Sequence, residues 1–186
     1  MDDNSRKWTV LESKEAYRKK WLTVLEDRCQ LPDGSVIDPY LTIAVPDFCN
    51  IIMVTPEQEV ILVRQYRHAA GIVSLELPGG MIEPGEDPAV AAKREMEEET
   101  GFQTQEFEFL YKIHPNPPLE KNLAYFYLAK NVVPTGTVAL DPFEDIELVF
   151  LHREAFMQKL LQHEFQHGVQ LSAMYAAAVQ LGWIKT

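Results

Sequence analysis

Glu95, Glu98 and Glu99 stand close together near the end of a segment that has the local signals of a helix. At roughly 100° per residue, their side chains fall within an arc of about 100°, whereas Glu97 points to another side. Acidic side chains at a helix C-terminus are unfavourable by roughly 0.3–1 kcal/mol each, and like charges three or four residues apart repel. A cation would relieve this cost, so the cluster indicates a metal site; a solvated acidic face is the alternative.

The ligand chemistry of this cluster indicates a hard divalent cation. The carboxylates have no Cys or His beside them, and oxygen donors suit Mg²⁺ or Mn²⁺. Glu95 and Glu99, at positions i and i+4, can bridge one or more ions. The turn Pro78-Gly79-Gly80 precedes the segment, and its exposed carbonyls could add a ligand.

The helix that must hold these carboxylates has clear start and stop signals. Asp87 is a good N-cap, Pro88 suits the first helical position, and Gly101 is a natural stop. We therefore expect a helix from about Pro88 to Thr100.

The spacing of residues around this helix resembles the Nudix box. That box is a glycine, five residues, Glu, seven residues, then Arg-Glu-apolar-any-Glu-Glu-any-Gly-apolar. The matching positions, with apolar Met96 and Phe102, are Gly80, Glu86, Arg94, Glu95, Glu98, Glu99 and Gly101. So many identities at fixed spacing make chance a poor explanation.

The resemblance implies roles for the residues of the box. Glu95 and Glu99 are the implied principal ligands of Mg²⁺, or of Mn²⁺, with Glu98 assisting in catalysis and metal binding and the Gly79 carbonyl contributing a ligand. The remaining residues of the box have implied structural roles: Glu86 and Arg94 pair to hold the loop against the helix, and Gly80 and Gly101 shape the turns.

Length and charge limit the class of protein. The chain has 186 residues, 46% of them hydrophobic, which suffices for one packed domain with a small appendage. A net charge of −11 argues against nucleic acid and anionic membranes as partners. The chain shows no signal peptide or membrane span, and its two cysteines, Cys29 and Cys49, suit reduced thiols, so we expect a cytoplasmic protein.

The pattern of apolar residues predicts an α+β fold. From about Trp8 to Pro46, apolar and polar residues alternate in short stretches, which are interrupted by the turn signal Pro32-Asp33-Gly34. This pattern indicates a small antiparallel sheet. Further strands are expected at 50–55, 59–65, 74–77, 107–113, 122–129 and 146–151, and two further helices at about 153–162 and 169–181. Nudix proteins are α/β/α sandwiches with a mixed sheet, so pattern and resemblance agree. We expect an N-terminal β extension over residues 1–47, which the resemblance links to dimerisation, and a Nudix hydrolase domain over residues 48–186.

Two arginines at the end of a predicted strand are candidates for binding phosphate. Arg64 and Arg67 precede the glycine turn, and guanidinium groups suit phosphate oxygens. For Arg64 a surface salt bridge is an equal alternative. Arg67 matches a phosphate-contacting arginine of Nudix enzymes that cleave ADP-ribose.

An acidic loop before the last predicted strand could supply a base. Attack of water on a diphosphate needs a group that accepts a proton near the metal, and a loop Glu can do this. Similar enzymes carry a Glu in a Glu-x-x-Glu-apolar pattern, which Glu144 matches best, with Glu147 as the substitute. A solvated acidic loop is the alternative.

Weaker signals concern the substrate. Pro117, fifteen residues past Phe102, resembles a marker of the ADP-ribose pyrophosphatase branch, and the loop around it resembles that of nucleoside diphosphate sugar hydrolases. Phe48 occupies a region where related dimeric enzymes present a base-stacking group, although a Phe is more often buried in a core. The resemblance also implies a homodimer that exchanges N-terminal segments.

The segment His163-Glu164-Phe165-Gln166-His167 spells a zinc-protease motif, HExxH. Gly168 interrupts the helix directly after it, and no third ligand of the usual kind follows. We therefore interpret this motif as a coincidence.

These observations together predict a Mg²⁺-dependent Nudix pyrophosphohydrolase of the ADP-ribose and nucleoside diphosphate sugar branch. The implied reaction yields a nucleoside monophosphate and a sugar phosphate. A metal-free nucleotide-binding regulatory module on the same fold, or a Nudix hydrolase acting on another nucleoside diphosphate derivative, are the alternatives.

Overall fold

The computed structural model, which describes residues 3–136, 138–140 and 144–185, divides into two compact units. The first contains the chain up to Pro46 together with His114–Leu123, and the second contains 47–113 and 124–186. The structure thus places the segment His114–Leu123, which lies within the predicted Nudix domain, in the N-terminal unit. The predicted boundary after residue 47 and the role of the extension in dimerisation stay predictions.

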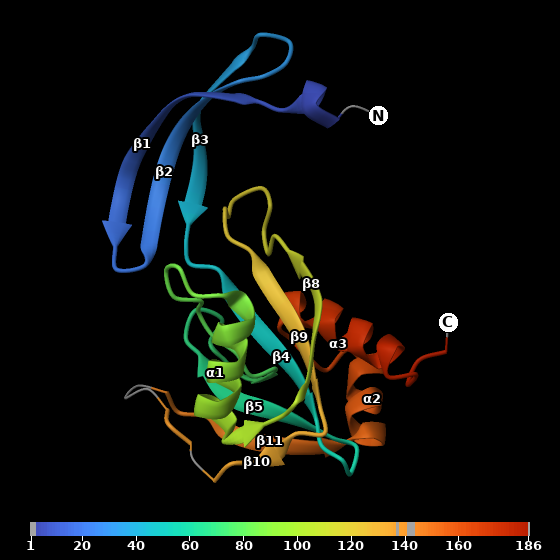
Figure 1. The fold of residues 1–186 in the computed structure, drawn as a ribbon. Helices are drawn as coiled ribbons and strands as arrows, with labels where there is room; N and C mark the ends of the chain where they lie inside the picture. The colour runs from blue at the N-terminus through green and yellow to red at the C-terminus, as the bar shows by residue number, and fades with distance from the viewer. Residues whose placement is uncertain (1–2, 137, 141–143, 186) are drawn as a thin grey trace. The chain divides into compact units, whose positions relative to one another are not determined.

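The first unit is built on an antiparallel sheet (Figure 1). A 3₁₀ helix, η1 (Asp3–Arg6), precedes its strands, which run in the order β1 (Thr9–Lys19), β2 (Leu22–Gln30) and β3 (Val36–Ala44). The predicted turn joins β2 to β3: Gly34 has φ +87°, and the Asp33 carboxylate accepts hydrogen bonds from the backbone N–H and hydroxyl of Ser35. Polar side chains and glycine thus define this hairpin, as the sequence predicted.

The segment His114–Leu123 is bound to this sheet by backbone and side-chain contacts. The backbone N–H of Ile43 donates to Leu119 at 2.7 Å, and the N–H of Lys121 donates to Ile43 at 3.0 Å. Beneath them, Lys121 Nζ lies 3.1 Å from an oxygen of Asp27, a carboxylate that is only 3% exposed. An ion pair with a buried carboxylate and a strand-like contact therefore fix this loop to the N-terminal unit.

The second unit is built on a mixed sheet. Its described strands are β4 (Phe48–Val54), β5 (Glu59–Arg67), β6 (Ile72–Glu76), β8 (Glu106–Ile113), β9 (Ala124–Lys130) and β11 (Glu147–His152). The order is β11-β5-β4-β9-β8, with β6 paired to β5; β4 and β9 run parallel and the other pairs are antiparallel. A separate short pair joins β7 (Phe102–Gln103) to β10 (Val133–Pro134).

Helices cover both faces of this sheet (Figure 1). Helix α1 (Pro88–Thr100) lies on one face, and α2 (Arg153–Leu161) and α3 (Gly168–Gln180) lie on the other. Successive side chains of β4 point to opposite faces: Ile51 and Met53 belong to the apolar cluster that includes α1 residues, whereas Ile52 and Val54 belong to the cluster with α2 and α3. Each such side chain contributes roughly 1.5–3 kcal/mol when fully buried. Because both faces are covered, β4 carries apolar residues on both faces rather than alternating, with Asn50 as its one polar residue.

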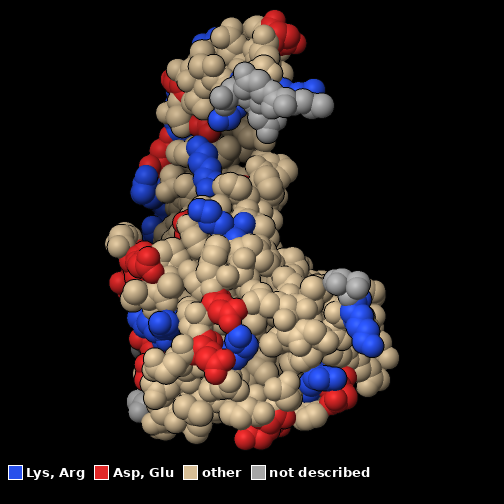
Figure 2. All heavy atoms as spheres, turned by 45° about the vertical axis from the view of Figure 1, so that its right-hand side comes forward, with Lys and Arg blue, Asp and Glu red and all other residues tan. Residues whose placement is uncertain are grey.

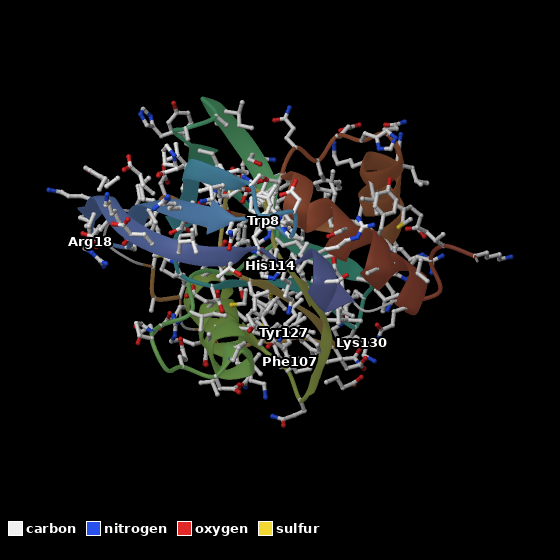
Figure 3. The ribbon with its side chains drawn as sticks, turned by 90° about the horizontal axis from the view of Figure 1, so that it is seen from above. Trp8, Arg18, Phe107, His114, Tyr127 and Lys130 are labelled. Atoms are coloured by element: carbon white, nitrogen blue, oxygen red, sulfur yellow. The ribbon has the colours of Figure 1, made fainter. Side chains whose placement is uncertain are left out.

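Aromatic rings extend the α1 side of the core. Phe107 of β8 and Tyr127 of β9 stack with ring centroids 5.0 Å apart (Figure 3), and Lys93 of α1 lies over the Phe107 ring at 5.2 Å. On the drawn face of this unit, acidic and basic side chains lie beside one another in small groups (Figure 2). In the described part of the chain, no helix is long and apolar enough to cross a membrane.

The ends of α1 are the ones predicted. Asp87 accepts hydrogen bonds from the N–H groups of Ala89 and Val90 at 2.9 and 3.3 Å, which satisfies two donors at the helix start. Gly101 ends the helix in the left-handed conformation, at φ +69°, where its N–H donates to Glu97. Local sequence signals therefore fix the register in which the glutamates are presented.

Candidate active site

A cleft of about 460 Å³ lies in the second unit, between the C-terminal half of α1, the glycine turn and the end of β5. Most of the residues singled out in the sequence meet there. The predicted site residues that line the cleft are Arg67, Gly79, Gly80, Arg94, Glu95, Glu98, Glu99 and Glu144. The fold thus brings Arg67 and Glu144, which lie outside the Nudix-like box, into the same cleft as the glutamates of α1.

The glutamates of α1 differ in burial, and burial raises the pKa of Glu95 and Glu99. Glu99 is 4% exposed, whereas the side chain of Glu98 is 44% exposed. Burial raises the pKa of Glu99 to about 8; the nearby charges of Glu95 and Glu144 add to this rise, and the hydrogen bond from Gly79 opposes it. Burial likewise raises the pKa of Glu95, and the hydrogen bond from Arg94 opposes that rise. The Glu99 carboxylate would therefore hold a proton readily unless a cation took the place of that proton.

The glycine turn approaches both α1 and β4 so closely that a side chain does not fit. A Cβ on Gly79, at φ +144°, would lie 2.0 Å from the Cys49 carbonyl oxygen, and one on Gly80 would lie 2.6 Å from the Glu95 carboxyl carbon. The N–H groups of Cys49 and Ile51 in β4 donate to the carbonyls of Gly80 and Pro78, both at 2.9 Å. The Gly79 carbonyl, the predicted ligand, lies between these two bonded carbonyls.

Arg94 holds the glutamates together by bridging three of them. Its Nε and Nη2 donate to the two oxygens of Glu86 at 3.0 and 3.1 Å. Its Nη1 donates to Glu95 at 2.8 Å and to Glu98 at 3.0 Å. These contacts join the loop before α1 to the helix and offset the repulsion between carboxylates at the helix end.

The two candidate phosphate-binding arginines have different surroundings. Arg67 lines the cleft and donates through Nε and Nη2 to Glu76 at 3.0 and 2.6 Å. Arg64 instead donates through Nη1 to both oxygens of Glu147, at 3.0 and 2.8 Å. Neither Arg64 nor Glu147 is among the residues that line the cleft.

The two candidate bases separate in the same way. Glu144 lines the cleft, and its charge acts on both Glu95 and Glu99, whose pKa values burial mainly raises. Glu147 begins β11, opposite Arg64 in the strand register, and its side chain is 63% exposed. The geometry therefore favours Glu144 as the group that faces a bound substrate.

The two weaker candidates lie outside the cleft lining. Phe48 is half-buried, packs against the core on the α2–α3 side of the sheet and forms a bridge to Met81. Pro117 is exposed, in a turn of the N-terminal unit. Their proposed contacts with substrate stay predictions.

The HExxH segment does not form a helix. It runs through the connection between α2 and α3, with His163 at φ +58° and Glu164 paired to Lys159. His167 lies at the N-cap of α3. The two histidines therefore do not share a helical face, which a zinc-protease motif requires.

The residues of the cleft fit a hard divalent cation in chemistry. Several carboxylates, one of them buried and inclined to hold a proton, offer oxygen donors alone. Among the described residues, no group of three or more His, Cys, Asp or Glu side chains is gathered tightly enough to enclose an ion. Glu95 is held by a hydrogen bond from Arg94, and Glu99 by one from the Gly79 N–H. Without a cation between them, the like charges of these carboxylates repel, which keeps them from gathering closely.

Sequence reasoning missed Glu76, which holds Arg67 of the cleft through two hydrogen bonds. Glu76 is 0% exposed. The only feature of the sequence that could have indicated its burial is its place at the end of the apolar stretch before Pro78. Because a carboxylate is costly to bury without a partner, this position predicts a nearby cation, which the structure identifies as Arg67.

Both the sequence and the fold of this chain resemble those of known proteins. Residues 47–171 match the NUDIX domain, and residues 8–41 match the nucleoside diphosphate sugar hydrolase N-terminal domain. A methanol dehydrogenase activator from Bacillus methanolicus is 28% identical over 80% of each chain. An ADP-ribose pyrophosphatase from Bacillus subtilis (strain 168) is 25% identical over 66% of each chain. Among solved structures, an ADP compounds hydrolase superposes with a TM-score of 0.81 at 23% identity, covering 96% of both chains. The predicted α+β sandwich with an N-terminal antiparallel extension is confirmed.

Proposed function

Because this chain belongs to the Nudix family, we propose that it hydrolyses the diphosphate linkage of ADP-ribose or of a related nucleoside diphosphate sugar. The family and the enzyme class, a Nudix pyrophosphohydrolase acting on nucleoside diphosphate derivatives, are the ones predicted from the sequence. The products would be a nucleoside monophosphate and a sugar phosphate. The match of residues 8–41 to the nucleoside diphosphate sugar hydrolase N-terminal domain supports this substrate class.

The observation that carries the proposal is the composition of the cleft. Carboxylates from α1 line the same hollow as Arg67 and Glu144. A diphosphate brings negative charge, so it needs both an arginine and a cation to offset the surrounding acids. An arginine fork and oxygen ligands for Mg²⁺ are therefore complementary parts of one site.

Each residue has a role that follows from its position. Glu95, Glu99 and Glu98, with the Gly79 carbonyl, would hold Mg²⁺, for which Mn²⁺ could substitute. When bound, the ion supplies charge neutralisation and lowers the pKa of an attacking water. Arg67 binds phosphate oxygens, and Glu144 orients the water and accepts its proton. Arg94 keeps the carboxylates in place through its contacts with Glu86 and Glu95.

A substrate panel tests the reaction. The purified chain is assayed with Mg²⁺ against ADP-ribose, ADP-glucose, GDP-mannose, UDP-sugars, dinucleoside polyphosphates and nucleoside triphosphates, with products identified. We expect a nucleoside monophosphate and a sugar phosphate from at least one nucleoside diphosphate sugar. Preference for triphosphates would contradict the substrate class and leave the enzyme class intact.

A matched pair of variants separates catalysis from simple binding. Glu99→Gln keeps the shape of the innermost carboxylate but removes its charge, so we expect turnover to fall at least about 100-fold. Glu97→Gln, on the exposed side of the same helix, should retain wild-type activity. Binding of ADP-ribose without turnover of any compound in the panel would instead favour the regulatory module.

The proposal includes a homodimer in solution. It rests on the resemblance of the N-terminal extension to segments that related enzymes exchange. Sedimentation equilibrium should give twice the mass of 21.3 kDa. A monomer that is fully active would contradict this part of the proposal alone.

A further inference from the structure

A carboxylate lies fully buried beside the cleft, at the end of β6. Glu76 is 0% exposed, although an isolated carboxylate in a protein interior carries a large desolvation cost. Burial by itself would raise its pKa, but the hydrogen bonds and the positive charge of Arg67 outweigh burial and lower it. Glu76 is therefore ionised, and its environment is built around that charge.

The main partner of Glu76 is an arginine of the candidate site. Arg67 Nε and Nη2 donate to separate oxygens of Glu76, at 3.0 and 2.6 Å. The pair is anchored at one end only: the Glu76 side chain is 1% exposed, and that of Arg67 is 45% exposed and lines the cleft. The Nη1 group is not used in this pair, so it can donate to another group.

A second buried side chain, Gln170, also contacts Glu76. Gln170 of α3 is 1% exposed, and its Oε1 accepts a hydrogen bond from the Leu77 backbone N–H at 2.7 Å. Its Nε2 lies 3.5 Å from Glu76 Oε2, a long hydrogen bond. One buried amide therefore contacts both the carboxylate and the backbone next to it, at the start of the glycine turn.

We propose that Glu76 is a positioning residue for Arg67, oriented by Gln170, and that it fixes the guanidinium in the cleft for binding the diphosphate of the substrate. The inference rests on the proposed function, because it assigns Arg67 the diphosphate as its ligand. A bidentate carboxylate fixes the plane of a guanidinium, so the remaining donors are held in one direction. Pre-ordering an arginine in this way reduces the conformational entropy lost when substrate binds.

A second Arg–Glu pair, which joins β5 to β11, shows why the first is not simply a structural contact. Arg64 and Glu147 also form a bidentate pair, but both side chains are exposed, 45% and 63%. An exposed pair needs no compensation for burial and contributes little to stability. In the Arg67–Glu76 pair the carboxylate is enclosed and the guanidinium reaches the cleft, which is the arrangement expected of a support for a binding group.

The test is the kinetics of Glu76→Gln with the substrate that the panel identifies. Gln keeps the shape and one acceptor but removes the charge, so Arg67 loses its fixed orientation. We expect KM to rise about tenfold and kcat to change less than about threefold, since a charged hydrogen bond acts on bound substrate and transition state alike. Glu108→Gln, which removes the charge of the partly exposed Lys130–Glu108 pair of the same sheet, is the control and should leave KM unchanged.

A double-mutant cycle with Arg67→Ala decides whether Glu76 acts through the arginine. In that background, Glu76→Gln should change KM less than about twofold, because nothing remains to be positioned. A further tenfold rise there would overturn the inference, as would an unchanged KM in the single variant. Thermal unfolding of the same variants separates positioning from a purely structural role. If Glu76 were only structural, Glu76→Gln would lower Tm and the fraction of active protein without changing KM.

A second variant keeps the inference testable if Glu76→Gln folds poorly. Gln170→Glu retains the acceptor for the Leu77 N–H but replaces the amide donor beside Glu76 with an acid. KM should then rise several-fold in the same direction; an unchanged KM in a folded variant would contradict the role of Gln170. If the wild-type chain cleaves no nucleoside diphosphate sugar, the proposed function fails, whereas activity with an unaffected Glu76→Gln removes only this inference.

Discussion

Glu99 accepts a hydrogen bond from the Gly79 N–H at 2.7 Å, so the acidic helix and the glycine turn meet at a buried carboxylate. Glycine at this position is a steric requirement, because a Cβ would lie 2.0 Å from the Cys49 carbonyl oxygen. The neighbouring Gly80 is in turn placed against the carboxyl group of Glu95. Turn and helix therefore form one unit, in which the backbone supports the acids that would hold a metal.

Alanine at the two glycines should have different consequences. Gly79→Ala forces a side chain against backbone at φ +144°, so we expect a loss of more than about 2 kcal/mol in the free energy of unfolding. Gly80→Ala meets only the end of a flexible glutamate, so the protein should fold and lose turnover as Glu95 is displaced. Urea unfolding and activity assays measure the two effects.

The control for this pair is Gly168→Ala. Gly168 begins α3, and a Cβ there would meet nothing within 4 Å. The substitution should leave activity unchanged and the free energy of unfolding within about 1 kcal/mol of wild type. Full activity of Gly80→Ala would show that the contact with Glu95 is unimportant.

The raised pKa of Glu99 predicts how stability depends on pH in the absence of metal. Burial, the largest cause, raises it from the ordinary 4.5 to about 8, so between these values the folded protein binds more protons than the unfolded chain. Its contribution to stability is complete below the unfolded pKa and is lost as pH rises through about 8. With EDTA present, Tm should therefore fall between about pH 5 and 9, and Glu99→Gln should flatten that fall.

Magnesium should oppose this dependence on pH. Because a proton and a cation compete for the same carboxylate, added Mg²⁺ should raise Tm more at about pH 8.5 than at about pH 6. Calorimetry with and without Mg²⁺ measures both effects. An equal rise at the two pH values would show that Glu99 is not a ligand.

The sequence predicts the local features of this protein well and the long-range ones poorly. The limits of α1 follow from Asp87 and Gly101, which act within a few residues of themselves. The contact between Arg67 and Glu76 instead depends on how β5 pairs with β6, where Arg67 lies opposite Ile72 and Glu76 lies opposite Val63. No periodicity in a single strand reveals that register.

The same reason separates Glu144 from Glu147. The pattern around both residues admits either as the base, and Arg64 is an equally acceptable phosphate ligand or surface ion. Pairing of β11 with β5 places Glu147 opposite Arg64, although the two are 83 positions apart in sequence. Long-range strand pairing thus decides which acid remains near the cleft.

The ion pair between Lys121 and the buried Asp27 gives a further prediction. Burial opposes ionisation of Asp27, but hydrogen bonds from Ser13, Lys121 and Thr42 outweigh it and lower its pKa. Its contribution to stability is therefore present above the unfolded pKa and is lost as pH falls through the folded one. Asp27→Ala should leave Lys121 without its partner and loosen His114–Leu123, which faster hydrogen exchange of the Lys121 amide would reveal. Glu26→Ala on the same strand is the control, with unchanged exchange expected.

Replacing each candidate base by its amide distinguishes them. Glu144→Gln removes a charge from the cleft itself, so kcat should fall by about 10²–10⁴-fold, the range typical of a lost general base. Glu147→Gln removes only an exposed partner of Arg64, so kcat should change less than about threefold. Steady-state kinetics over about pH 6 to 9 measure kcat of both variants. Loss of the general base should also remove the part of the pH dependence of kcat that reports its ionisation. A larger loss in Glu147→Gln than in Glu144→Gln would reverse the assignment and require the loop before β11 to rearrange when substrate binds.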